Sequence, residues 1–225
     1  MKTFNDTEHR AARHIVSIVC AAALAAAVSM STAVPAHAHP IVVPTLPQSL
    51  EVLAPNRPFL LGKAEGTQNY VCLPTGVDAG GMPTFGWKLY TPEATLFNRD
   101  TTKQIITHFF SPNPDEVNTD PLTSFHPVRA AWQSSKDTST VWARTLVASD
   151  AVIVTQGAIP WLKLTVVGSQ NGDSRDGMLM VTTFIQRVNT TGGVAPAPDT
   201  CDSMQEVGRQ AFVPYTADYI FYTDQ

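Results

Sequence analysis

Apolar and polar residues alternate with a period of two along many short runs of this chain. In residues 159–167, Leu162, Leu164 and Val166 fall on one face of an extended strand and polar residues fall mostly on the other. Residues 178–188 are apolar on both faces, as expected for a strand in the middle of a sheet. No long stretch shows the apolar period of a helix. The pattern therefore predicts about ten short strands and an all-β fold.

Turn-forming residues divide these strands from one another. Residues 59–64 and 68–73 flank Glu65-Gly66-Thr67 in a hairpin-like arrangement. The 13 glycines and 17 prolines are spread along the chain, which suits many turns. Together they favour a single-domain antiparallel β-sandwich or barrel over residues 59–225.

Two Pro-rich stretches interrupt the strand pattern. Residues 39–58 contain five prolines and predict an extended segment that leads into the β domain. Residues 111–127 contain four prolines, which exclude a long helix or a central strand. This connection is long for a compact domain, and such loops are often functional.

Residues 1–38 have the three parts of a secretory signal peptide. A polar leader with three basic residues precedes the uncharged run 15–30, and Ala36-His37-Ala38 matches a small-x-small cleavage site. The run is shorter than a membrane-spanning helix needs. We therefore expect a secreted or periplasmic chain that begins at His39.

The charge of the mature chain limits its partners. The whole chain has 15 basic and 19 acidic residues, and removal of the leader leaves 12 and 17, a formal charge of −5. An acidic chain without basic runs argues against nucleic acid and anionic membranes as partners. No later segment is long and apolar enough to predict a membrane span.

Cleavage would leave two cysteines, Cys72 and Cys201. An even number in an oxidising compartment predicts a disulfide between them. Two buried free thiols or a metal site are the alternatives. Neither cysteine has a CxxC partner or a nearby histidine, which argues against a metal.

Arg187 stands at the end of the most apolar run. A guanidinium there must find a partner or reach water. We expect a structural ion pair with Asp218, and Asp199 is the second choice. An arginine that faces a ligand is the functional alternative.

The usual catalytic motifs are missing from the sequence: G-x-S-x-G, H-E-x-x-H, and a G-x-G-x-x-G that follows a strand. A cut before His39 would expose an amine and an imidazole, and His108 or His126 could add a third nitrogen for Cu(II). Copper polysaccharide monooxygenases share this one feature. A histidine placed there by chance is the simpler interpretation, so we expect no cofactor and keep copper as the alternative.

Six strings of the chain are distinctive: Tyr70-Val71-Cys72, Pro92-Glu93-Ala94-Thr95-Leu96-Phe97, Thr107-His108-Phe109, Ile159-Pro160-Trp161-Leu162-Lys163-Leu164, Gln186-Arg187-Val188-Asn189-Thr190-Thr191-Gly192-Gly193 and Pro214-Tyr215-Thr216-Ala217-Asp218-Tyr219-Ile220-Phe221-Tyr222. Together they resemble the DUF3455 family of exported proteins. After His108 the chain departs from the family, which has a Gly-Pro-Thr-Trp turn there. The resemblance implies a secreted β-rich domain. Some fungal members are labelled malate dehydrogenase, but this chain lacks a dinucleotide-binding fingerprint, so we do not expect that activity.

The sequence thus favours a binding or surface-associated module for an unknown small-molecule or polysaccharide ligand. Exposed aromatic side chains suit such ligands, which makes the Pro-rich loop 111–127 and the tryptophans candidate recognition elements. The four tryptophans are Trp87, Trp132, Trp142 and Trp161. A secreted enzyme is the alternative, either a copper oxidase built on His39 or a hydrolase with a carboxylate pair that spacing alone does not identify.

Overall fold

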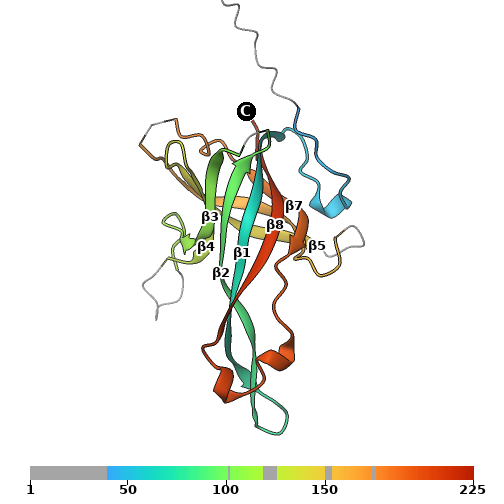
Figure 1. Cartoon of the computed structure of the whole chain (residues 1–225). Coiled ribbons are helices and arrows are strands. Elements are labelled where there is room, and N and C mark those ends of the chain that lie inside the picture. The colour runs from blue at the N-terminus through green and yellow to red at the C-terminus, as the bar shows by residue number, and fades with distance from the viewer. Residues whose placement is uncertain (1–39, 101, 119–125, 150–153, 174–175) are drawn as a thin grey trace, which may run out of the picture. The chain divides into compact units, whose positions relative to one another are not determined.

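The protein forms a closed antiparallel β-barrel whose strands follow one another in chain order (Figure 1). This computed structural model describes residues 40–100, 102–118, 126–149, 154–173 and 176–225, so the predicted signal peptide and His39 lie outside the described residues. The strands are β1 (Arg57–Val77), β2 (Pro83–Asn98), β3 (Gln104–Pro112), β4 (Val128–Ser134), β5 (Thr140–Ser149), β6 (Trp161–Gln170), β7 (Phe184–Gly192) and β8 (Gln210–Thr223). Three single-turn 3-10 helices accompany them: η1 (Gln48–Leu50), η2 (Pro198–Thr200) and η3 (Met204–Glu206).

The predicted all-β class is confirmed, and of its two architectures the barrel is the one formed. Closure comes from the pairing of β1 with β8, in which Ala64 lies opposite Ala217. Eight strands replace the expected ten because some of them are long. In the part of the chain that the structure describes, no helix is long and apolar enough to cross a membrane.

The hairpin expected around Gly66 is instead one continuous strand, β1. Its register with β2 runs without a break from Gly62 to Asn69. A Cβ built on Gly66 would lie 2.0 Å from the carbonyl oxygen of Glu93. The glycine therefore allows the close approach of β2 and does not form a turn.

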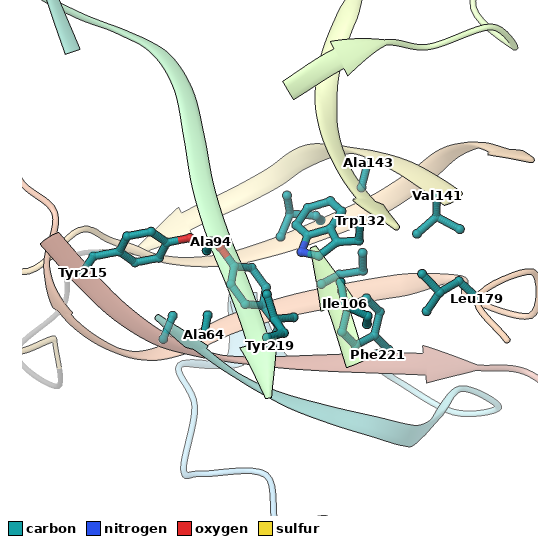
Figure 2. Close-up of a cluster of buried hydrophobic side chains, with 14 of the residues drawn as sticks. Ala64, Ala94, Ile106, Trp132, Val141, Ala143, Leu179, Tyr215, Tyr219 and Phe221 are labelled. Atoms are coloured by element: carbon teal, nitrogen blue, oxygen red, sulfur yellow. Dashed lines mark hydrogen bonds between the residues drawn. The ribbon is translucent and has the colours of Figure 1, made fainter. Parts of the chain in front are cut away.

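The strand expected over residues 178–188 begins only at Phe184. Before it the backbone turns, with Met180 N bonded to Gly177 O and Thr182 N bonded to Leu179 O. Leu179 is fully buried and belongs to the core of the barrel. It lies at the opposite end of the core cluster from Tyr215 (Figure 2). These residues are apolar because Leu179 packs inside the barrel, and not because they form a central strand.

The barrel interior is filled by large and small side chains in alternation. Trp132, Tyr215, Tyr219 and Phe221 are buried there, and the ring of Phe221 meets that of Trp132 edge-on at 6.5 Å (Figure 2). Small inward residues leave room for them: Ala64, Ala94, Ala143 and Ala217. Small barrels commonly fill their interior in this way.

A second apolar cluster lies on the outer face of the barrel, beneath the segment of residues 40–56, which we call the N-terminal strap. Leu50 of the strap is fully buried against residues that include Trp161 and Ile220. Gln186 is also fully buried, and its Nε2 donates to Leu50 O at 2.7 Å. The Tyr222 hydroxyl donates to Gln186 Oε1. The Pro-rich segment is therefore packed into the same compact unit as the barrel, Pro40–Gln225.

The predicted disulfide between Cys72 and Cys201 is confirmed. It links β1 to the middle of the connection between β7 and β8. The bridge closes a loop with a sequence separation of 129 residues. In the chain-entropy model, such a loop adds about 4–5 kcal/mol to stability.

Candidate ligand-binding site

A cavity of about 380 Å³ lies in the open end of the barrel, and all eight strands contribute residues to its wall. It opens where β3 ends and β4 begins, because Val128 and Thr145 are exposed members of its lining. This volume lies at the lower end of the range for small-molecule sites.

An aromatic cluster of His108, Trp132 and Tyr219 forms the floor of the cavity. The His108 and Trp132 rings stack with centroids 4.3 Å apart and an interplanar angle of 8°. Tyr219 meets Trp132 edge-on at 5.7 Å. The three residues are only 1–3% exposed, so they close the floor of the cavity. The indole Nε1 of Trp132 is buried and has no hydrogen-bond partner among the described residues.

His108 is a neutral imidazole in this floor. Burial lowers its pKa to about 3, although the bond to the Ala131 backbone acts in the opposite direction. Nδ1 lies 2.8 Å from Ala131 O. A carbonyl oxygen only accepts, so Nδ1 carries the proton and donates it, and Nε2 keeps its lone pair. His108 can therefore accept one hydrogen bond from a ligand but does not carry a charge at neutral pH.

Arg187 of β7 also lines the cavity, between Leu162 of β6 and Tyr219 of β8. Its Nε and Nη2 donate to Pro160 O at 3.2 and 2.9 Å. The positive charge of Arg187 affects the pKa of a neighbouring aromatic residue. Burial raises the pKa of Tyr70, and the positive charge of Arg187 acts against that rise.

The expected ion pair between Arg187 and Asp218 is not the arrangement found. Asp218 accepts instead from Lys63 Nζ at 2.8 Å and from Asn189 Nδ2 at 2.9 Å. The second choice, Asp199, lies in η2. Arg187 instead lines the cavity wall.

The first part of the Pro-rich loop is anchored beside the cavity opening. Arg129 holds Glu116 through two bonds of 2.7 and 2.9 Å, and its hydrogen bond lowers the pKa of Glu116 to about 2. Asn113 is fully buried and donates to Glu116 and to Val167 O. The later part of the loop, residues 119–125, lies outside the described residues.

The three histidines considered for copper are not brought together by the described structure. His108 lies in the cavity floor. His126 is exposed, and its Nδ1 lies 2.6 Å from Glu116 O. His39 lies outside the described residues. Within residues 40–225, apart from the undescribed gaps, no group of three His, Cys, Asp or Glu side chains is placed to hold a metal ion.

Of the four candidate tryptophans, Trp132 alone lines the cavity. Trp142 is buried and donates to Ser111 Oγ at 2.7 Å. Trp161 is buried in the outer cluster under the strap. Trp87 donates to Thr200 Oγ1 at 3.0 Å, close to the disulfide segment. The last three therefore have structural contacts.

The sequence did not single out Tyr70, Gln68 or Tyr219 as cavity residues. Only Tyr219 left a usable signal, since it alternates with outward residues in β8. Gln68 and Tyr70 were missed because the expected hairpin divided β1 at Gly66.

The chain matches the family described as "protein of unknown function (DUF3455)" over residues 54–223. It belongs to the DUF3455 family. The resemblance seen in the sequence is thereby confirmed, and the matched region contains every described strand, the cavity and the two cysteines of the disulfide. No curated protein and no solved structure matches the chain. Within this DUF3455 chain, the strap lies almost entirely before the matched region.

Proposed function

We propose that this DUF3455 protein is an exported binding protein that holds a small organic molecule in the open end of its barrel. The cavity of about 380 Å³ carries this proposal. Barrel mouths are common sites for small ligands. The closed aromatic floor favours a small molecule over a polysaccharide, because a polymer chain needs a groove that is open at both ends.

The chemistry of the lining supports binding over hydrolysis. The described lining residues include no Asp, Glu, Ser or Cys, so the described wall lacks both a carboxylate pair and a Ser or Cys nucleophile. Apolar side chains predominate, with a few polar groups that could fix an orientation, among them Gln68, His108 and Arg187.

Export is supported by the signal peptide expected from residues 1–38 and by the Cys72–Cys201 disulfide. Such bridges persist in oxidising compartments. An exported protein with an apolar cavity suits a role in capturing or carrying a molecule outside the cytoplasm.

The test is a fluorescence titration with N-phenylnaphthylamine, an uncharged probe that becomes bright in apolar cavities. We expect saturable binding of one probe per protein. Ala130→Phe places a large ring in the cavity wall and should weaken binding at least about tenfold. Ala148→Phe is the matched control, because Ala148 is exposed and is not part of the lining. Equal effects of the two variants, or saturable binding of neither this probe nor an anionic probe of the same skeleton, would refute the proposal.

A further inference from the structure

We infer that the ligand is a small organic anion, whose acid group binds the guanidinium of Arg187 while its apolar body lies inside the barrel. This inference rests on the proposed function and specifies its ligand class. Three independent features of the cavity support it: its balance of charge, its free hydrogen-bond donors and the apolar surface beside them.

The cavity wall has an excess of positive charge. Its charged lining residues are Arg129, Arg144 and Arg187, and its described lining contains no carboxylate. Arg129 is neutralised by Glu116 in a bidentate pair. Arg144 is exposed to water at the opening. Arg187 is partly buried. Among the described residues it forms no ion pair, since Asp218, on the neighbouring strand β8, is paired with Lys63. An anion would therefore gain most at Arg187.

The hydrogen-bond geometry of Arg187 leaves room for such an anion. Its Nε and Nη2 converge on a single acceptor, Pro160 O. Among the described residues, no acceptor is bonded to Nη1. A guanidinium has five N–H donors in a planar fork, which matches the two oxygens of an acid group. Trp132 adds a second donor without a partner in the described chain, its buried indole Nε1.

The surface around these donors is apolar. Leu162 lies directly opposite Arg187 in the β6–β7 pairing, and Ile159 and Leu164 also line the cavity. A ligand that consisted of the acid group alone would leave this surface without contact. An acid that carries an aromatic or aliphatic body would bury this surface, which favours binding.

A pair of probes with the same ring system tests the charge preference. Anilinonaphthalene sulfonate carries one acid group, and N-phenylnaphthylamine is the same skeleton without it. We expect the anionic probe to bind the natural protein at least about tenfold more tightly than the neutral one, since a hydrogen bond to a charged group favours binding by about that factor or more.

The preference should depend on Arg187. Arg187→Met keeps a long side chain but removes the charge, and should abolish the preference while neutral-probe binding changes by less than about threefold. Arg187→Lys keeps the charge and loses the fork, so it should retain part of the preference. Arg57→Gln is the matched control, because Arg57 is exposed at the start of β1 and does not line the cavity. Circular dichroism verifies that each variant is folded.

The outcomes separate this inference from the proposed function. Binding of the neutral probe without any preference for the anion would overturn the inference and leave the binding function intact. An anion preference that survives in Arg187→Met, in folded protein, would also overturn it. Failure of both probes to bind the natural protein would overturn both.

Discussion

Arg187 and Asp218 point to opposite sides of the barrel wall. In the β7–β8 pairing, Arg187 lies opposite Tyr219, and Val188 lies opposite Asp218. Successive side chains of a strand face opposite ways, so this offset of one residue separates the two charges. Arg187 lines the cavity, whereas Asp218 binds Lys63 and Asn189. Adjacent residues of one family-like string, Arg187 and Val188, thus face the cavity and the outer side of the barrel wall, respectively.

We predict that substitutions of Arg187 and Asp218 act independently on stability. The effects of Arg187→Met and Asp218→Ala on the free energy of unfolding should add to within about 0.5 kcal/mol, because neither residue contacts the other. Urea unfolding of the two single variants and the double variant measures this coupling.

A double-mutant cycle of Lys63→Met with Asp218→Ala is the positive control for this coupling measurement. The Lys63 side chain is 50% exposed, so solvent screens the pair and we expect a coupling of only about 0.5–1 kcal/mol. A larger coupling for Arg187 with Asp218 than for Lys63 with Asp218 would contradict the opposite-face arrangement.

The N-terminal strap should contribute strongly to stability through Leu50. This side chain is fully buried outside the barrel, so Leu50→Ala should lower the free energy of unfolding by about 2–5 kcal/mol. Leu53→Ala is the same substitution at a position that is 70% exposed, and it should change stability by less than about 0.5 kcal/mol. Chemical denaturation measures both. Small and equal effects would show that the strap does not pack on the barrel in solution.

The sequence predicted the features that depend on the local pattern of apolar residues or on the number of cysteines. The period-two alternation around Leu162 and Leu164 indicated strands, and two cysteines in an exported chain indicated their pairing. The choice between sandwich and barrel could not be made in this way. It depends on the pairing of β1 with β8, which brings together the two ends of the domain and leaves no local mark.

The errors came from residues whose neighbours are distant in sequence. A glycine such as Gly66 is typical of a turn. Here its small size instead allows the backbone of Glu93 to pack closely against β1. The residues around Leu179 are as apolar as a central strand, but Leu179 lies in a turn before the strand and packs inside the barrel. The partner of Arg187 was misplaced because a register shift of one residue reverses the face of every side chain.

The stability of the fold should fall between pH 8 and pH 5 because of His108. Burial lowers its pKa to about 3 in the folded protein, from an ordinary value of 6.5. Between these values the unfolded chain binds one proton more than the folded chain, so stability is complete above pH 6.5 and decreases as the pH falls. The limiting slope is about 1.4 kcal/mol per pH unit, which amounts to a loss of about 2 kcal/mol at pH 5.

His108→Gln should remove this dependence, because an amide does not titrate and can still donate to Ala131 O. His126→Gln is the control, since His126 is exposed and its removal should leave the slope unchanged. Urea unfolding of the natural protein and both variants at pH 8, 7, 6 and 5 measures this slope. These pH values lie above the range in which protonation of Glu116 and Asp137 dominates the pH dependence of stability. Burial raises the pKa of Asp137, but hydrogen bonds from Ser139 and from the backbone of Met178 outweigh it and lower that pKa to about 2. A slope that persists unchanged in His108→Gln would mean that another group causes it and that folding does not lower the pKa of His108.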